Sequence, residues 1–284
     1  MAPDPFSRVG IVGLGLMGGS LARSLKALPD PPMIRGLTLL DEERDGAMRE
    51  GVIDEGPIDP RNFFPGLDLV VYGTPLRATL ELLDHHRPLL DPSTVITDLA
   101  SLKAPVLERA RALGLEGRYV GSHPMAGSEA SGFMASRQGL YEGRRIWLVA
   151  EKAALALVGR IKGLWKSVGG ECVVTDPWDH DRQMAWVSHL PQVASTALAR
   201  VLARAGFARD QLGPGGMDMT RLAASNPSMW GDLLRHAPDT LGEALAKTGA
   251  AIETMRKLIE EGRMDEVEEL MRDTGAWSEG NPWR

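Results

Sequence analysis

Cysteine is almost absent from this chain of 284 residues, and its absence excludes a fold held together by internal disulfides. The only cysteine is Cys172. A single thiol fits a reducing compartment, so we expect a cytoplasmic protein. The neighbouring residues Val173 and Val174 indicate a buried strand, which gives Cys172 a structural role.

Long hydrophobic runs and an excess of basic charge are also lacking. No uninterrupted apolar segment is long enough to span a bilayer, and the first residues lack the form of a signal peptide. The formal net charge is −6 and no basic stripe is present, so we expect neither a membrane nor nucleic acid as partner. None of the six histidines has metal-ligand spacing, which predicts no metal.

What the chain does have is a glycine-rich turn between its first apolar run and its first helical stretch. Gly13 permits the tight turn, Gly15 lets a pyrophosphate approach the backbone, and Gly18 allows close packing of helix on strand. The helix N-terminus that follows favours phosphate. The predicted cofactor-binding turn consists of Gly13, Gly15, Leu16, Met17 and Gly18.

An acidic residue follows at the offset at which dinucleotide-binding domains hold the adenosine ribose. The second expected strand, residues 36–40, ends at Asp41, which lies 23 residues after Gly18. A carboxylate near this offset accepts hydrogen bonds from the ribose hydroxyls and repels a 2′-phosphate. The sequence therefore predicts NAD rather than NADP. A glycine-rich turn in a nucleotide-free domain is the alternative, and this order of strand, glycines, helix and acid disfavours it.

Strands and helices alternate up to about residue 176, which predicts an α/β domain of Rossmann type with a mainly parallel sheet. The expected strands are residues 9–12, 37–40, 69–72, 95–97, 119–121, 146–149 and 172–174. The expected helices between them are residues 21–28, 42–50, 77–90, 104–113 and 153–168.

The pattern becomes entirely helical after residue 176. Helical segments are expected over residues 180–205, interrupted only by Pro191, and over residues 241–261 and 265–272, with a Gly/Pro-rich link at residues 212–216. We therefore expect a nucleotide-binding domain over residues 1–176 and an all-helical domain over residues 177–284. The segment 180–205 carries apolar residues on more than one face, so a partner subunit is expected to cover it in a homodimer.

Candidate chemistry lies where the expected strands end, because ligands of open α/β sheets bind beyond the carboxyl ends of the strands. Thr74 and Pro75 follow the third strand and either border the cofactor or form an ordinary turn with Thr74 as a helix cap. Ser101 follows the fourth strand and either caps the next helix or presents its hydroxyl to the nicotinamide site.

A histidine at the end of the fifth strand is the strongest candidate for a catalytic group. His123 is followed by Pro124 and a Gly/Ser turn, which places it well for general-base work near neutral pH. In the helical domain, the residues around His189 and Arg221 do not by themselves indicate a function. An arginine there would nevertheless supply a bidentate clamp for a substrate carboxylate.

Six segments of the chain together resemble the prephenate/arogenate dehydrogenase family over nearly its whole length. They are residues 13–20, 97–103, 121–129, 179–182, 188–191 and 220–230. The glycine segment is common to many dehydrogenases. Ser-His-Pro-Met-Ala-Gly in the third segment and Ser-His-Leu-Pro in the fifth, in this order and spacing, are much more specific.

The resemblance implies an NAD-dependent oxidative decarboxylation of a cyclohexadienol in tyrosine biosynthesis. It implies that His123 accepts the proton of the ring hydroxyl, that Ser101 orients this pair, and that Arg221 holds a substrate carboxylate. It also implies a dimer formed by the helical domain. The remaining residues of the expected substrate site are His189, Ser128, Glu129 and Gln192.

One position departs from the family pattern. Family members often follow Ser-His-Leu-Pro with a second histidine, where this chain has Gln192. A glutamine keeps hydrogen bonding but carries no charge, so the choice between prephenate and arogenate stays open.

Two other functions remain as alternatives at this point. A β-hydroxyacid dehydrogenase shares the glycine motif, but that family has a catalytic lysine with an asparagine one turn on. Neither Lys247 nor Lys257 has an asparagine at that spacing. An NAD-binding sensor without turnover would not need His123, Ser101 and Arg221 together.

Overall fold

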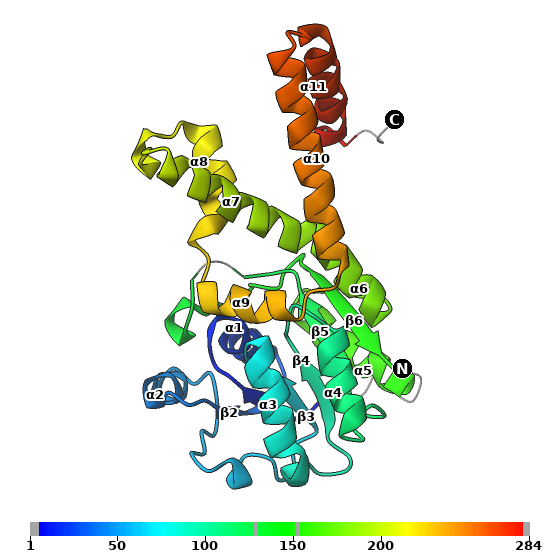
Figure 1. Ribbon diagram of the computed structural model, residues 1–284. Coiled ribbons are helices and arrows are strands. Elements are labelled where there is room, and N and C mark those ends of the chain that lie inside the picture. The colour runs from blue at the N-terminus through cyan, green and yellow to red at the C-terminus, as the bar shows by residue number, and fades with distance from the viewer. Residues whose placement is uncertain (1–5, 128–129, 152–153, 281–284) are drawn as a thin grey trace.

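A computed structural model describes residues 6–127, 130–151 and 154–280 of the chain. Its N-terminal part contains all the strands, and its C-terminal part consists of helices (Figure 1). Among the described residues, no helix is both long enough and apolar enough to cross a membrane.

Four parallel strands form the first sheet, in the order β2-β1-β3-β4. Their bounds are Arg8–Val12 for β1, Met33–Leu37 for β2, Leu69–Tyr72 for β3 and Val95–Asp98 for β4. The strands are almost continuously buried because helices cover both faces, as is usual for parallel sheets.

The two faces of this sheet belong to two hydrophobic cores. Side chains alternate along each strand, so Ile11 and Val71 face one core while Val12 and Val70 face the other. The first core takes side chains from α1 (Leu16–Lys26), α2 (Asp41–Arg49) and α5 (Leu155–Ser167). The second takes them from α3 (Leu76–His86) and α4 (Ala104–Ala112).

A second sheet of three strands continues from the first. β5 (Val120–Pro124) pairs antiparallel with β6 (Arg145–Ala150), which pairs parallel with β7 (Glu171–Val174). A parallel bridge between Ile96 and Tyr119 connects the two sheets. The expectation of a mainly parallel sheet in a Rossmann-type domain is therefore confirmed.

The strand that contains Cys172 is less buried than the sequence suggests. β7 lies at the sheet edge, so Val173 and Val174 are partly exposed and Cys172 is half-buried. Burial raises the pKa of the Cys172 thiol.

The helical part begins at α6, and two helix pairs extend away from the sheets (Figure 1). Its α-helices are α6 (Pro177–Met184), α7 (Leu190–Arg204), α8 (Pro214–Thr220), α9 (Pro227–Arg235), α10 (Thr240–Glu260) and α11 (Met264–Ser278). α7 and α8 form one arm, and α10 and α11 form the other. α9 returns to the sheets, where Leu233 joins the core formed with α3 and α4.

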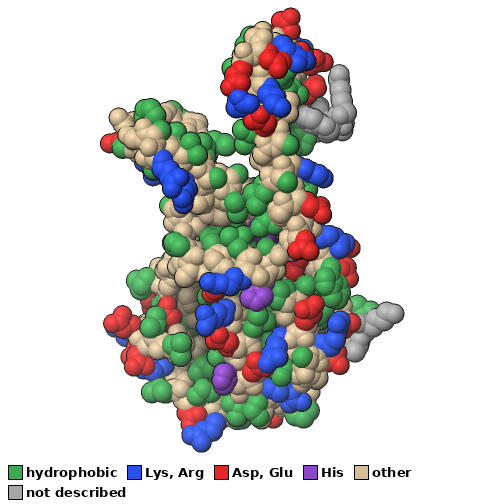
Figure 2. Space-filling model, in the orientation of Figure 1, with side chains coloured by type: hydrophobic (Ala, Val, Ile, Leu, Met, Phe, Trp, Pro, Cys, Tyr) green, Lys and Arg blue, Asp and Glu red, His purple; other side chains and the backbone are tan. Residues whose placement is uncertain are grey.

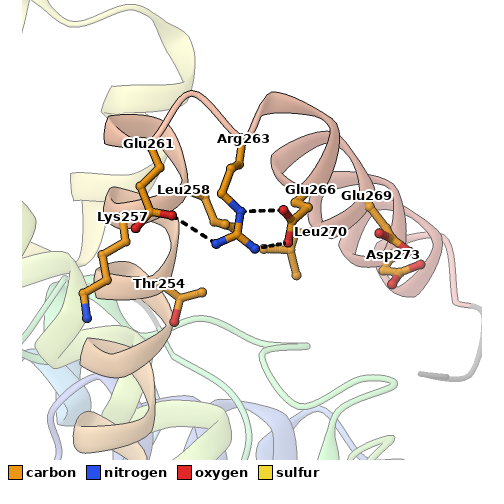
Figure 3. A pocket seen from close by; sticks show the side chains of 9 residues that line it. All are labelled: Thr254, Lys257, Leu258, Glu261, Arg263, Glu266, Glu269, Leu270 and Asp273. Atoms are coloured by element: carbon orange, nitrogen blue, oxygen red, sulfur yellow. Dashed lines mark hydrogen bonds and ion pairs between the residues drawn. The ribbon is translucent and has the colours of Figure 1, made fainter.

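The turn between α10 and α11 is fixed by ion pairs (Figure 3). Arg263 donates to Glu261 at 3.0 Å and to Glu266 at 2.5 Å. Charged side chains gather at this tip of the arm (Figure 2).

The second strand lies earlier in the chain than the sequence predicts, at Met33–Leu37 instead of residues 36–40. β2 stops at Leu37, because its partner β1 stops at the paired residue Val12. Leu39 and Leu40 extend the apolar pattern, but both are exposed. Asp41 therefore does not end a strand. It is the first residue of α2, and its carboxylate pairs with Arg44 at 2.6 Å.

The segment 180–205 is helical, as expected, but the interruption is not at Pro191. It is the π-helical turn Ala185–His189 between α6 and α7, and Pro191 lies in the first turn of α7. The Gly/Pro-rich residues 212–216 are not only a link, because Pro214 begins α8. A proline is well tolerated there, since the first amides of a helix have no partner within it.

Candidate active site

The glycine turn after β1 has the geometry of a dinucleotide cradle. Gly13 has φ +89°, a conformation that favours glycine, and its amide donates to Leu37 at 2.7 Å. A Cβ on Gly18 would lie 1.9 Å from the Gly13 carbonyl oxygen, so helix and strand can pack this closely only with glycine. A Cβ on Gly15 would meet nothing within 4 Å. Open space at the start of α1 therefore fits a pyrophosphate bound by the first amides of the helix.

The turn after β3 lies against this cradle. The Thr74 methyl group would be 2.8 Å from a Cβ on Gly13. Pro75, not Thr74, is the N-cap of α3, and the Thr74 hydroxyl instead contacts the Thr79 hydroxyl at 2.9 Å. The capping role considered for Thr74 is therefore wrong, and its place beside the glycine turn is the one that suits cofactor binding.

A pocket of about 360 Å³ lies at the carboxyl ends of β4 and β5 and brings Ser101 and His123 together. It is lined by Ser101, His123, Pro124, Met125, Ala126, Gly127, Arg137, Leu140, Arg144 and Ser188. Ser101 does not cap α4, because the N-cap is Lys103. The helix amides at Lys103 and Ala104 donate instead to the Asp181 carboxylate, which leaves Ser101 at the pocket wall.

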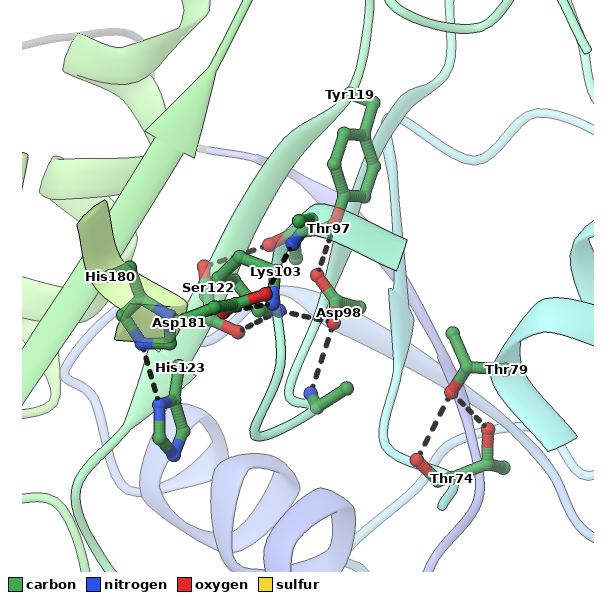
Figure 4. Close-up of polar contacts among 12 residues, drawn as sticks. Thr74, Thr79, Thr97, Asp98, Lys103, Tyr119, Ser122, His123, His180 and Asp181 are labelled. Carbon is green, nitrogen blue, oxygen red and sulfur yellow. Dashed lines mark hydrogen bonds and ion pairs between the residues drawn. The ribbon is translucent and has the colours of Figure 1, made fainter. Parts of the chain in front are cut away.

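His123 is almost fully buried and its imidazole is held by a second histidine. Its Nδ1 lies 2.9 Å from Nε2 of His180, as Figure 4 shows. The pKa of His123 lies well below its usual value. Burial is the largest cause, followed by repulsion from His180, Lys103 and His189. At neutral pH His123 is therefore an uncharged imidazole, the form that a general base requires.

A buried ion pair connects the Ser101 segment to the His123 strand. Lys103 pairs with Asp98, and its Nζ also donates to the Ser122 carbonyl at 2.8 Å. The Tyr119 hydroxyl donates to the second Asp98 oxygen at 2.6 Å. Burial lowers the pKa of Lys103, while Asp98 opposes that shift. The pair fixes the end of β4 against the residue that precedes His123.

The predicted residues of the helical part lie on neighbouring turns. His189 ends the π-helical turn, packs edge-to-face against Trp230, and has its pKa lowered to about 4 by burial. Within the described residues, neither of its ring nitrogens has a hydrogen-bond partner. Gln192 donates to the Leu222 carbonyl at 2.8 Å, which holds the short helix that begins at Arg221.

The structure does not bring every predicted residue to the pocket. Arg221 is exposed and does not line it, and His189 and Gln192 are buried but do not line it either. Ser128 and Glu129 lie outside the described residues, so their predicted part in substrate binding stays a prediction.

Sequence reasoning missed several groups in and behind the pocket. Arg137 and Arg144 lie in its wall, but no motif around them signals a role. His180 and Asp181 are inside a motif that the sequence does show, yet their contact with His123 depends on the fold.

Comparisons with known proteins agree with this geometry. Residues 21–174 match the family model of the prephenate dehydrogenase nucleotide-binding domain, and residues 176–273 match that of the prephenate dehydrogenase dimerization domain. The chain belongs to the prephenate dehydrogenase family.

Individual relatives support this membership. The prephenate dehydrogenase of Bacillus subtilis is 28% identical, over 96% of this chain and 76% of that protein. The cyclohexadienyl dehydrogenase of Zymomonas mobilis is 30% identical, over 83% of each. The crystal structure of prephenate dehydrogenase from A. aeolicus with hydroxyphenyl propionate and NAD⁺ superposes with a TM-score of 0.90. It is 29% identical and covers 98% of this chain and 99% of that one.

Membership in this family sets aside the β-hydroxyacid dehydrogenase alternative. The two family models together account for both parts of the chain. The expected fold, a Rossmann-type domain followed by a helical domain, is confirmed. NAD is the cofactor of this dehydrogenase, and the glycine turn is the part of the structure that fits it.

Proposed function

We propose that this chain catalyses the NAD-dependent oxidative decarboxylation of prephenate to 4-hydroxyphenylpyruvate, or of arogenate to tyrosine. The observation that carries this proposal is the placement of His123. An uncharged, buried imidazole lies at a pocket shared with Ser101, next to a glycine turn that fits a dinucleotide. The names of the relatives support the same reaction.

The residues of the pocket suit this chemistry. His123 accepts the proton of the ring hydroxyl, and Ser101 orients the two groups. The bound cofactor accepts the hydride from C4. The bond between C1 and the carboxylate breaks, its electron pair stays in the ring, and carbon dioxide leaves. The ring becomes aromatic, and His123 returns the proton to the phenol. Because aromatisation drives the reaction, the protein mainly positions the groups and polarises the hydroxyl.

Arg221 remains the proposed clamp for a substrate carboxylate, with His189 and Gln192 on the turns that support it. Arg137 and Arg144 offer further guanidinium groups at the pocket wall. Prephenate and arogenate both carry two carboxylates, and they differ only in the side chain, which has a keto group in prephenate and an amino group in arogenate. Kinetics with both substrates side by side decide between them.

In this proposal Glu43, and not Asp41, is the carboxylate that accepts hydrogen bonds from the cofactor ribose. Dinucleotide-binding domains place a carboxylate at the end of the second strand, about 20 residues after the last glycine. In this chain that position is held by Thr38, which directly follows β2 and is not acidic. The Thr38 hydroxyl donates to Glu43 Oε2 at 2.9 Å, and the Phe133 amide donates to Oε1 at 3.1 Å. These bonds hold the Glu43 carboxylate at the strand end.

Glu43→Gln should therefore narrow the preference for NAD over NADP. The substitution removes the charge that repels a 2′-phosphate. The Kd for NADP divided by the Kd for NAD should therefore fall by about tenfold. Isothermal titration with each cofactor measures this ratio without turnover. Asp41→Asn is the matched control and should leave it unchanged. A large effect of Asp41→Asn alone would return the role to Asp41.

The helical part forms a homodimer in this proposal, and the chain divides after residue 176. Support comes from apolar side chains that both arms leave exposed: Val201, Phe207, Met219, Ile252, Ile259, Met271 and Trp277. Their arms extend away from the sheets, so the chain's own sheet domain does not cover them (Figures 1 and 2). The match to a dimerization domain supports the same assembly.

Light scattering at micromolar concentration should give twice the chain mass of 30.8 kDa. Ile252→Glu, at a side chain that is 66% exposed on α10, should lower this mass because it places a charge in an apolar interface. Ile58→Glu, at a side chain that is 77% exposed on the sheet domain, is the control and should leave the mass unchanged. A monomer mass for the unmodified protein would contradict the proposal.

The cytoplasm is the proposed location, supported by the single cysteine of the chain. A test for NADH formation with prephenate separates the enzyme from an NAD-binding sensor, because a sensor binds NAD without turnover.

A further inference from the structure

We propose that His180 and Asp181 are positioning residues that fix the tautomer of His123, so that Nε2 of His123 presents its lone pair to the pocket. The inference rests on the proposed role of His123 as a base. It derives from a line of three buried side chains, His123, His180 and Asp181, which are 8%, 0% and 4% exposed (Figure 4).

The Asp181 carboxylate accepts hydrogen bonds from two backbone amides. Its Oδ1 accepts the Lys103 amide at 2.8 Å and its Oδ2 accepts the Ala104 amide at 2.9 Å. Both Asp181 oxygens therefore act as acceptors, and a carboxylate that accepts at both oxygens has no hydrogen to donate to a third partner. The ring nitrogen of His180 that lies 2.7 Å from Oδ1 is Nδ1, so Nδ1 must carry a hydrogen.

The hydrogen on Nδ1 of His180 determines which nitrogen of His123 carries a hydrogen. Burial, the largest influence on the pKa of His180, lowers it against the opposing effect of Asp181, and Lys103 adds repulsion. An uncharged His180 with hydrogen on Nδ1 has a lone pair on Nε2. The His123 Nδ1 atom, 2.9 Å away, must therefore donate. A neutral imidazole has one hydrogen, which leaves Nε2 of His123 as the acceptor.

The consequence for turnover is electrostatic. When Nε2 of His123 takes the proton of the substrate hydroxyl, the ring becomes positively charged. His180 still accepts from Nδ1, and the Asp181 charge lies behind it. No proton needs to move along the line. Lys103 opposes the positive charge on His123, and the Asp181 carboxylate compensates this repulsion.

Asp181 also has a second role, which decides how the inference is tested. It accepts the first amides of α4, the helix that follows Ser101, so its replacement would disturb both the helix and the tautomer. His180→Gln keeps these helix bonds and removes only the imidazole. A glutamine amide can offer either its oxygen or its NH₂ group to His123, so the tautomer is no longer dictated.

The experiment is ¹⁵N NMR of histidine-labelled protein without substrate, combined with kinetics. In the unmodified protein we expect His123 to be protonated on Nδ1 and bare on Nε2. His180→Gln should mix the two tautomers and lower kcat about tenfold or more, with KM and the Kd for NAD near normal. His86→Gln is the control. His86 is also buried, and its Nδ1 lies 3.2 Å from the Tyr72 hydroxyl, so this variant tests the loss of a buried histidine elsewhere.

Two results would overturn the inference. One is an unmodified protein whose His123 carries its hydrogen on Nε2. The other is a His180→Gln variant with the same tautomer and kcat as the unmodified protein. The tautomer is measured without substrate, so it decides the inference even if prephenate is not turned over. A protein that fails to turn over prephenate would contradict the proposed function, but it would leave the measured tautomer as a separate result.

Discussion

Replacing His123 with asparagine should lower kcat about a hundredfold or more, while the Kd for NAD stays near normal. Asparagine cannot take the hydroxyl proton, and the loss of a general base costs about two to four orders of magnitude. The glycine turn that binds NAD is a separate element and stays intact. Stopped-flow measurement of NADH formation gives kcat, and titration calorimetry gives the Kd. Ser101→Ala should act in the same direction more mildly.

The pH profile adds a second readout for the same residue. Only the uncharged imidazole accepts a proton, and burial puts the pKa of His123 well below the usual 6.5. kcat/KM should therefore hold at pH 6.5 and decline only as the pH falls further, through the lowered pKa. His85→Asn, at an exposed histidine of α3, is the control and should keep this profile. A near-normal kcat in His123→Asn would reject His123 as the base.

Removing Arg221 should raise the KM for prephenate by about ten- to a hundredfold. A charge-assisted, bidentate pair with a carboxylate contributes about 1.5–3 kcal/mol, which corresponds to that range. Arg221→Lys keeps the positive charge but not the two parallel N–H donors of a guanidinium. Its KM should therefore lie between those of Arg221→Ala and the unmodified protein.

The matched control is Arg61→Ala, at an exposed arginine that pairs with Asp59 on the sheet domain. Its KM should be unchanged. If Arg221→Ala also leaves KM unchanged, the carboxylate is held by other guanidiniums, and Arg137 and Arg144 at the pocket wall are the next to replace.

Much of the fold is predictable from local patterns in this sequence. The parallel strands are continuous apolar runs because both faces of the sheet are buried. Errors occur where tertiary contacts overrule the pattern. Leu39 and Leu40 prolong the apolar run of β2, but the chain leaves the sheet at Leu37 because β1 offers no further partner. Pro191 marks an apparent helix break, yet it is accommodated in the first turn of α7 after a π-helical turn.

The candidate site is predictable only where function lies in a short motif. The glycine turn, Ser101 and His123 can be found because each follows a strand, and strand ends converge in this fold. The role proposed for Glu43 could not be predicted from the sequence, because the position of this carboxylate depends on where β2 ends and on a bond to Thr38. The contact of His180 with His123 joins residues 57 positions apart, and no spacing rule encodes it.

The proposed reaction can be checked by supplying the purified protein with NAD and prephenate and measuring the products of both oxidation and decarboxylation. We expect one NADH and one carbon dioxide for each prephenate consumed, with an aromatic product and no NADH when prephenate is omitted. Absence of NADH with both prephenate and arogenate, or NADH formed without carbon dioxide, would contradict it.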